Sequence, residues 1–331
     1  MNPLVSVTIV TFNSARFIGR CLQYLSEQDY EPIEIIVVDN ASEDETVATV
    51  RSVQERRIRL VPNDVNTGFA GGQNQAISLS RGEWILTLNP DVRLTRNFLS
   101  SAISSAGPDV SVGSVSGKLI AMRPDFTIPN EPVLDSTGIY FTPNLRHFDR
   151  GSREPDHGQY DLPEYVFGVT GAAGLYRRKM IEDVSIGGEF FDNDFFAYRE
   201  DADLAWRAQL FGWKCLYVPE ALAYHVRNVF PDDRRSVNGL VNMHSVKNRF
   251  LMRIKNATWK LYLRHIVAIC IRDLLVIGGC LFREWSSLPA FIIVLKLFGR
   301  TWSKRRAIMR RRRAPESYMI PLFAGLPDSK R

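Results

Sequence analysis

The chain has 331 residues, of which 45% are hydrophobic and 24% are charged. This composition supplies enough apolar surface for one large α/β domain or two smaller ones, and it argues against a disordered chain. The net charge of +6 arises mainly near the C-terminus, because eight basic residues lie between Arg300 and Arg313. The four cysteines show neither zinc-ligand spacing nor a disulfide framework, and no signal segment opens the sequence, so we expect a cytoplasmic protein that is not exported.

The first hundred residues alternate between strand and helix patterns. Strand patterns cover 5–10, 33–38, 57–61 and 83–88, and the first helix pattern covers 15–25. Strands separated by helical segments predict a doubly wound, mostly parallel sheet with flanking helices. Ligands of such sheets bind outside the carboxyl ends of the strands. Thr11, Asp39 and Asp91 stand at those ends.

Asp39 admits two roles at the end of its strand. A strand-end aspartate commonly caps the next helix, but Asn40, Ser42 and Asp44 can cap equally well. The Asp39 carboxylate is then left to accept hydrogen bonds from a ligand, such as the N–H of a pyrimidine base.

A glycine-rich segment at 66–74 precedes a helix pattern at 75–80. Glycines at a helix N-terminus let backbone N–H groups approach a phosphate or a sugar closely. The segment lacks the G-x-G-x-x-G order directly after the first strand, which disfavours a nicotinamide-dependent enzyme.

A dense acidic cluster occupies residues 198–207. Glu200, Asp201 and Asp203 lie within two helical turns, Asp91 forms another acidic corner, and an isolated His225 follows. Such a set can close around a divalent metal and a phosphorylated donor. The alternative is a helix whose first turn carries acids because they favour the helix dipole.

The order of these blocks resembles the family 2 inverting glycosyltransferases of GT-A fold, and among them the rhamnosyltransferase-type branch. The resemblance covers residues 4–230. The matching blocks are 5–13, 37–42, 66–72, 88–91, 171–173, 195–204 and 218–221, followed by His225.

The resemblance implies a donor site with a metal. Asp39 would hold the nucleotide base, and Asp91 and His225 would bind Mg²⁺ or Mn²⁺ beside the donor diphosphate. Asn89 replaces the first aspartate of the family's D-x-D motif, which removes one charge and is expected to weaken metal affinity. The further residues expected around the donor are Thr11, Asn13, Asn66, Gly68, Gly71, Gly72 and Arg207.

The resemblance also implies a catalytic base. In an inverting transfer the acceptor hydroxyl loses its proton as it attacks the anomeric carbon. Asp201 is the candidate base, because it takes the second place of the family's Glu-Asp pair, and Glu200 is the alternative. Arg207 is expected to brace the site, facing a phosphate or pairing with an acid.

The C-terminal ninety residues differ in character. Apolar segments at 266–282 and 288–298 are interrupted by charges, and no uncharged run reaches the ~18 residues of a spanning helix. We therefore expect helices that lie in the membrane interface, with the basic run 300–313 on anionic headgroups. A dimerisation helix pair is the alternative. Nucleic-acid binding is disfavoured because base-stacking aromatics do not alternate with the arginines.

The sequence thus predicts a GT-A type domain over 1–240, with a nucleotide-binding half at 1–105 and an acceptor and catalytic half at 106–240. Residues 241–331 would form a membrane-associating helical region. We expect transfer of rhamnose from dTDP-rhamnose to a lipid-linked or polysaccharide acceptor, by a peripheral protein on the cytoplasmic face of the inner or plasma membrane. The alternatives are a UDP- or GDP-linked donor, or a non-catalytic nucleotide-sugar-binding scaffold, which the presence of Asn89 leaves open. A homo-oligomer is compatible with either.

Overall fold

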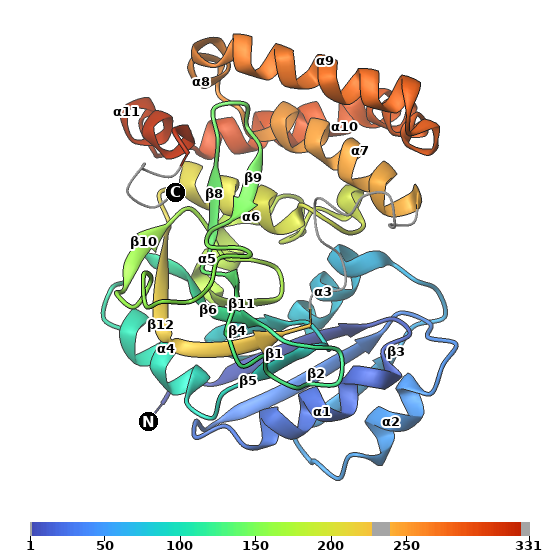
Figure 1. The fold of residues 1–331 in the computed structure, drawn as a ribbon, viewed down its shortest axis with the longest axis vertical. Helices are drawn as coiled ribbons and strands as arrows, with labels where there is room; N and C mark the ends of the chain where they lie inside the picture. Colours follow the sequence, from blue (N-terminus) through green and yellow to red (C-terminus); the bar gives the residue numbers. More distant parts are fainter. Residues whose placement is uncertain (1, 227–238, 326–331) are drawn as a thin grey trace.

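The computed structural model describes residues 2–226 and 239–325, and within them the chain forms a ten-stranded mixed sheet flanked by helices (Figure 1). The first seven elements are β1 (Val5–Thr11), α1 (Ala15–Ser26), β2 (Ile33–Asp39), α2 (Thr46–Ser52), β3 (Ile58–Pro62), α3 (Gly68–Leu79) and β4 (Trp84–Leu88). Strands β4, β1, β2 and β3 lie side by side in that order and are parallel. This half matches the predicted strand and helix alternation.

The apolar runs of the sequence explain why β1, β2 and β4 are buried on both faces. β4 is buried along its whole length, and β1 and β2 are buried at all but one position each. Strands buried on both faces read as continuous runs of β-branched and leucine residues, as these do. The strand ends carrying Thr11 and Asp39 pair directly, so their side chains meet at one edge of the sheet.

The glycine-rich segment lies inside a helix, which corrects the predicted boundary. The sequence pattern placed the helix at 75–80 after a glycine loop, whereas α3 begins at Gly68. A Cβ on Gly72 would come within 2.8 Å of the Val10 side chain. The glycines therefore let α3 approach β1 closely, and this packing outweighs the weak helix propensity of glycine.

The second half of the domain extends the sheet with antiparallel pairs. Its elements are β5 (Val92–Leu94), α4 (Phe98–Ala106), β6 (Val112–Ala121), β7 (Leu134–Ser136), β8 (Ile139–Phe141), β9 (His147–Asp149), β10 (Glu164–Val166), β11 (Ala173–Arg177), α5 (Arg178–Val184), η1 (Asn193–Phe195), α6 (Glu200–Leu210) and β12 (Lys214–His225). β11 inserts between β4 and β6 and is antiparallel to both, whereas β12 runs parallel to β6. The sheet is therefore mixed, with strands β1 to β4 forming its parallel N-terminal part.

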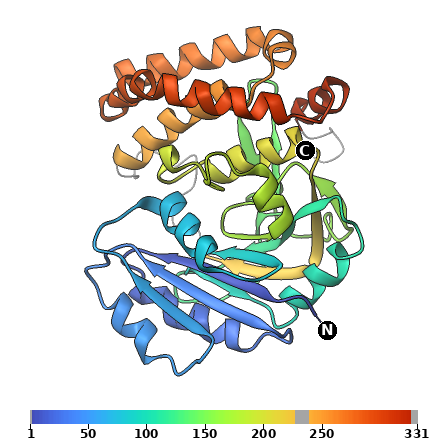
Figure 2. The ribbon, with the colours of Figure 1, turned by 180° about the vertical axis from the view of Figure 1, so that it is seen from behind.

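The C-terminal region is helical, as predicted, and packs on the half at 106–240 that was predicted to be catalytic, called the catalytic half below (Figures 1 and 2). It consists of α7 (Gly239–Asn256), α8 (Trp259–Arg264), α9 (Ile266–Phe282), η2 (Trp285–Ser287), α10 (Pro289–Arg311), α11 (Glu316–Met319) and η3 (Ile320–Phe323). The buried Phe323 ring lies 4.7 Å from the Trp206 ring of α6 and 5.2 Å from the Phe141 ring of β8. None of the helices in the described ranges combines the length and apolar composition needed to cross a bilayer.

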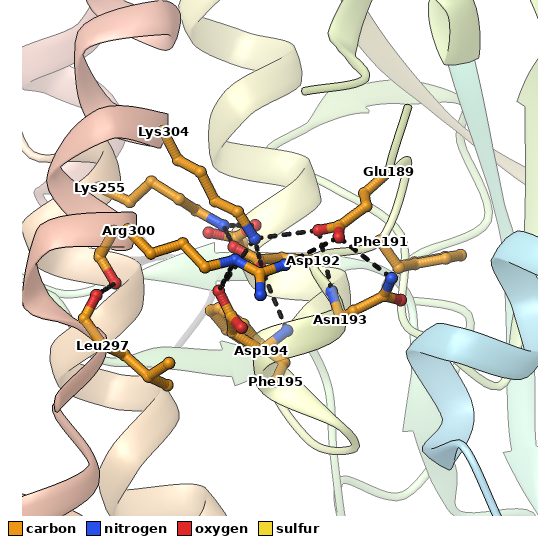
Figure 3. Close-up of polar contacts among 12 residues, drawn as sticks. Glu189, Phe191, Asp192, Asn193, Asp194, Phe195, Lys255, Leu297, Arg300 and Lys304 are labelled. Atoms are coloured by element: carbon orange, nitrogen blue, oxygen red, sulfur yellow. Dashed lines mark hydrogen bonds and ion pairs between the residues drawn. The ribbon is translucent and has the colours of Figure 1, made fainter. Parts of the chain in front are cut away.

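Buried ion pairs fasten this helical region to the segment before α6 (Figure 3). Lys304 of α10 lies 2.9 Å from the carboxylate of Glu189 and 3.0 Å from that of Asp194, and it also pairs with Asp192. Lys255 of α7 pairs with Asp192 from the other side. The basic residues of α10 nearest the catalytic half thus have acidic partners within the same chain.

Candidate active site

The acidic corner after β4 and the end of β12 meet as a pair. β5 and β12 are antiparallel with His225 opposite Val92. This pairing brings the ring of His225 beside Asp91, the residue before Val92. The Nε2 atom of His225 lies 3.5 Å from Oδ1 of Asp91. Strand pairing therefore brings together two residues that are 134 positions apart (225 − 91), and their binding of a metal stays a prediction.

Asp135 holds the other side of this histidine. β7 pairs with β6 next to β12, and its Asp135 carboxylate lies 2.8 Å from Nδ1 of His225. Burial by itself lowers the pKa of His225. The charges and hydrogen bonds of Asp135 and Asp91 outweigh that effect and raise the pKa to about 10.

The donor atoms at this corner fit a divalent cation. Asp91 offers a partly exposed carboxylate and His225 offers Nε2, while Asp135 fixes the ring through Nδ1. A carboxylate behind a ligating histidine is the usual support for a metal-bound imidazole. No cage of three or more acidic, histidine or cysteine side chains is formed among the residues that the structure describes.

The acid pair opens α6, where sequence analysis expected the base. Oδ2 of Asp201 accepts a hydrogen bond from the Gly171 N–H at 2.9 Å, and Oδ1 accepts one from the Ala202 N–H at 2.7 Å. Glu200 is more deeply buried, and its Oε2 finds no hydrogen-bond partner within the described residues. Of the two, the Asp201 side chain is the more accessible.

Both carboxyl groups are shifted toward the neutral form. Burial, and then the charge of Asp201, raise the pKa of Glu200 to about 8. Burial, and then the charge of Asp149 on β9, raise the pKa of Asp201. Near neutral pH, Glu200 therefore retains its proton more readily, which leaves Asp201 as the better base of the pair.

A two-residue segment connects the acid pair with the acidic corner after β4. Gly171 donates its N–H to Asp201, and the carbonyl of the next residue, Ala172, accepts from the N–H of Asn89 at 2.9 Å. Asn89 is the residue that replaces the first aspartate of the D-x-D motif. The segment 171–172 therefore contacts both the candidate base Asp201 and Asn89, which stands two residues before the candidate metal ligand Asp91.

The base-binding residues expected from sequence gather at the ends of β1 and β2. Asp39 is 1% exposed, and its Oδ1 accepts hydrogen bonds from the hydroxyls of Thr11 at 2.7 Å and Ser42 at 2.6 Å. Its Oδ2 accepts from the Ser42 N–H at 2.9 Å. Asn13 has a φ of 49° and accepts a hydrogen bond from the Glu43 N–H. These contacts close the loop after β2, and contact of Asp39 with a base stays a prediction.

The glycine segment is tied to the same edge. Asn66 accepts a hydrogen bond from the Gly68 N–H at 2.8 Å, and Asn40 donates to the Gly68 carbonyl at 2.9 Å. A Cβ on Gly68 would come within 2.5 Å of the Phe196 carbonyl oxygen, and one on Gly71 within 2.9 Å of the Thr67 side chain. The structure thus explains these glycines by close packing, and their contact with a donor also stays a prediction.

Arg207 departs from its expected place beside the donor. Its guanidinium is 1% exposed, pairs with Asp203 at 3.3 Å and donates to the carbonyls of Val184 and Phe190 at 2.7 and 2.6 Å. Pairing with an acid was one of the two expected roles. Because its donors are used inside the protein, Arg207 is not available to a phosphate, and we no longer assign it to the donor site.

Sequence analysis missed several residues that this site uses. Asp135 lies in the predicted acceptor and catalytic half, but its contact with His225 was not predicted, because a three-residue strand such as β7 has no detectable periodicity. Lys255 and Asn256 of α7 bind the Asp203 carboxylate at 2.8 and 2.7 Å. These two contacts join segments 52 and 53 residues apart, and no local pattern marks them.

The chain is similar to known proteins. A family model described as "Glycosyl transferase family 2" matches residues 6–184. The succinoglycan biosynthesis protein ExoO of Rhizobium meliloti (strain 1021) is 32% identical over 116 residues, which is 34% of this chain and 33% of that protein. The chain thus spans about a third of the length of that relative.

A second relative is similar over most of both chains. It is the N-acetylglucosaminyl-diphospho-decaprenol L-rhamnosyltransferase of Mycobacterium tuberculosis (strain ATCC 25618 / H37Rv), 26% identical over 307 residues, or 86% of this chain and 96% of that protein. Among solved structures, the mannosyltransferase PcManGT from Pyrobaculum calidifontis, in complex with GDP-Man and Mn²⁺, superposes with a TM-score of 0.54 at 19% identity over 94% of this chain and 86% of that one. This likeness establishes the fold, including the C-terminal helices.

Proposed function

Because this chain belongs to glycosyl transferase family 2, we propose that it is a metal-dependent inverting enzyme that moves rhamnose from dTDP-rhamnose to a lipid-linked or polysaccharide acceptor. Glycosyl transfer from a nucleotide sugar in glycan synthesis follows from the family. The donor sugar and the acceptor rest on the relative from M. tuberculosis, whose name specifies an L-rhamnosyltransferase.

The observation that supports the proposal is the segment 171–172, whose backbone contacts both the candidate base and the stretch of chain that leads to Asp91. The Gly171 N–H donates to Asp201, and the Ala172 carbonyl accepts from the N–H of Asn89, two residues before Asp91. An inverting transfer needs a base on one side of the sugar and charge neutralisation on the other. A backbone segment that touches both groups sets their separation.

The residues of the chain divide the reaction between them. Asp201 takes the proton of the acceptor hydroxyl as the new bond to the anomeric carbon forms and the bond to the nucleotide diphosphate breaks. Asp91 and His225 would hold Mg²⁺ or Mn²⁺, which neutralises the departing diphosphate when bound. Asp135 keeps the His225 ring oriented through Nδ1. Glu200, kept largely protonated, leaves the negative charge of the pair on Asp201.

A donor screen with the purified full-length protein tests this proposal. Release of nucleotide diphosphate and labelling of an N-acetylglucosaminyl diphospholipid would be measured with dTDP-rhamnose and with UDP- and GDP-linked sugars, with Mn²⁺ added or chelated. We expect metal-dependent transfer with dTDP-rhamnose. Transfer from another nucleotide sugar alone would refute the donor assignment. Tight donor binding without turnover of any donor would favour the scaffold.

We also propose that the protein lies on the cytoplasmic face of the membrane through an apolar face of α8, α9, η2 and α10. Highly exposed side chains on this face include Phe282 at 83%, Leu295 at 75% and Leu274 at 70%. Others exposed there are Trp259, Leu263, Val267, Ile271, Leu281, Trp285, Ile292, Phe298 and Trp302. Val267, Ile271 and Leu274 of α9 are exposed and recur at helical spacing, so they form an apolar stripe on this helix, which is unusual on an isolated soluble surface.

A lipid surface is the partner that fits this face. Lys260, Arg264, Arg283 and Lys296 are exposed on or beside the same helices, so an apolar surface is bordered by positive charge. Helices of that composition lie in the interface of anionic membranes. Figures 1 and 2 place α9 at the end of the molecule opposite α1 and α2, so an attached protein would hold its nucleotide side away from the lipid.

The structure changes which residues this membrane proposal uses. In the run 300–313, Arg300 and Lys304 pair with acids of the catalytic half, and Arg313 pairs with Asp183. Removing this run would therefore disturb the fold as well as any lipid contact. We assign attachment to the apolar face, with the exposed basic residues in support.

Vesicle binding separates the alternatives. We expect the wild type to sediment with vesicles containing phosphatidylglycerol, and a Leu274→Ser, Phe282→Ser variant to lose most of this binding. Arg51→Ala, on the far helix α2, serves as the control. Equal binding by the double variant and the wild type would refute the proposal, and a dimer in light scattering that the double variant splits would identify the dimerisation alternative.

A further inference from the structure

The backbone before the acid pair is held in an unusual conformation. Phe196, Tyr198 and Arg199 have φ values of 64°, 70° and 70°. Residues other than glycine occupy this left-handed region rarely, and they remain there only where surrounding contacts hold them. Arg199 is also the residue directly before α6, so its conformation sets the direction in which Glu200 and Asp201 leave the loop.

Asn248 of α7 supplies three of the hydrogen bonds that hold this segment. Its side chain is fully buried, and its amide nitrogen donates to the carbonyls of Phe195, Ala197 and Tyr198 at 3.0, 2.8 and 2.7 Å. An amide has two N–H groups, so three carbonyls share them. These three carbonyls converge on one side chain in a loop where Phe196, Tyr198 and Arg199 are in the left-handed conformation.

Neighbouring residues of α7 add further contacts. Lys247 is 4% exposed and donates to the Asp194 carbonyl at 2.7 Å. The guanidinium of Arg199 donates to the carbonyl and hydroxyl of Ser245 at 2.9 and 3.1 Å. Residues 245, 247 and 248 thus contact the loop within one turn of α7.

The opposite side of the loop touches the donor side of the domain. The Phe196 carbonyl accepts a hydrogen bond from the Ala70 N–H of α3 at 3.1 Å, and Gly68 lies so close that a Cβ would clash with it. The loop is therefore fixed between α3 and α7. Its position is decided jointly by the nucleotide half and by a helix that begins 55 residues after the family match ends (239 − 184).

We propose that Asn248, with Lys247 beside it, is a positioning residue that fixes the catalytic base through the loop 194–199. This inference rests on the proposed function, in which Asp201 is the base. The C-terminal helical region is then a component of the active site as well as a covering layer. Displacing a catalytic group by about 1 Å can lower turnover on the order of 10²-fold, so the contacts of one amide are sufficient for a measurable effect.

Substitution in the full-length protein tests this role. Asn248→Ala removes the amide donors, and Asn248→Asp keeps the size but directs a carboxylate toward three carbonyl oxygens. We expect kcat to fall on the order of 10²-fold in both, while the KM for the donor changes far less. Thr301→Ala is the matched control, because its buried hydroxyl donates to the Leu297 carbonyl within α10 and does not contact the loop.

Two results would overturn the inference. In an active wild type, it fails if the kcat of Asn248→Ala stays near that of Thr301→Ala, or falls only in proportion to a lower melting temperature. Hydrogen exchange gives a readout that needs no activity, since loss of the contacts should raise exchange at 194–201 in Asn248→Ala and not in Thr301→Ala. If hydrogen exchange at 194–201 is unchanged in Asn248→Ala, the positioning role is refuted even when no donor is turned over. If exchange is raised but the protein has no transferase activity, only the proposed function is refuted.

Lys247→Met provides a second variant if Asn248 variants do not fold. It removes one cation and its hydrogen bond to the Asp194 carbonyl while retaining an apolar stem of similar length. We expect a smaller fall in kcat than for Asn248→Ala, with partial recovery in Lys247→Arg. Equal activity in Lys247→Met and the wild type would count against the positioning role.

Discussion

Replacing Asp201 by asparagine should abolish most turnover while leaving the protein folded. The substitution keeps the shape of the side chain but removes the group that accepts the acceptor proton. Loss of a general base lowers turnover by a factor on the order of 10² to 10⁴. Donor affinity should persist, since the expected donor contacts lie at Asp39 and Asp91.

The effect of Asp201→Asn on stability follows from the two hydrogen bonds of the carboxylate. Its oxygens accept from the N–H groups of Gly171 and Ala202, and an amide can keep only one of these bonds. Losing one hydrogen bond costs about 0.5–1.5 kcal/mol. Burial and the charge of Asp149, which raise the pKa of Asp201, show that the charged form is disfavoured, and the neutral amide removes that cost. The two effects oppose each other, so we expect a free energy of unfolding within about 1 kcal/mol of the wild type.

Three measurements on one preparation test this reasoning. Transfer rate, donor affinity by calorimetry and urea denaturation would be compared for Asp201→Asn and the wild type. The transfer rate of the wild type should also rise with pH through the pKa of Asp201, because the ionised form is the base, and level off above it. A folded Asp201→Asn protein that transfers sugar at the wild-type rate would refute the assignment. A parallel loss of donor affinity would point to a binding role.

Three further predictions concern the surroundings of the base. Glu200 has a raised pKa of about 8 against 4.5 for an ordinary glutamate, so the unfolded chain loses this proton first and wild-type stability falls as pH rises between these values. Glu200→Gln should therefore unfold at a higher temperature than the wild type at pH 9 and at nearly the same temperature at pH 4. An equal difference in melting temperature at the two pH values would contradict the raised pKa of Glu200. Lys255→Met removes the cation shared by the buried carboxylates of Asp192 (Figure 3) and Asp203, which keep Lys304 and Arg207 as partners, and should lower the free energy of unfolding by about 3 kcal/mol. Arg300→Met removes a half-exposed cation that pairs with Glu189, and should lower the free energy of unfolding by about 0–1 kcal/mol. Equal losses in the Lys255 and Arg300 variants would show that burial does not govern the strength of these ion pairs. Asp135→Asn should weaken Mn²⁺ affinity about 10–100-fold in titrations with a nucleotide diphosphate, and unchanged affinity would exclude a supporting role for Asp135.

Local sequence patterns located the elements and many candidate residues but not all of their contacts. The strands at 33–38 and 83–88 and the helix at 266–282 were predictable because continuous or periodic apolar residues reflect burial directly. Arg207 was misplaced at the donor because an arginine near acids looks the same in sequence whether it faces a phosphate or a buried aspartate. The start of α3 was missed because glycine propensity argues against a helix, and only packing on β1 reverses that preference.

The sequence by itself determined the parallel nucleotide half, the acid pair at the start of a helix, and the candidate ligands Asp91 and His225, because each depends on a strand end or on residues within one turn. Only the tertiary structure decided what surrounds them. Asp135 reaches His225 through strand pairing across 90 residues, and Asn248 reaches the loop before Asp201 across about 50. Contacts of that separation depend on how strands and helices are arranged in space, and hydrogen bonds between distant segments leave no periodic signal in the chain.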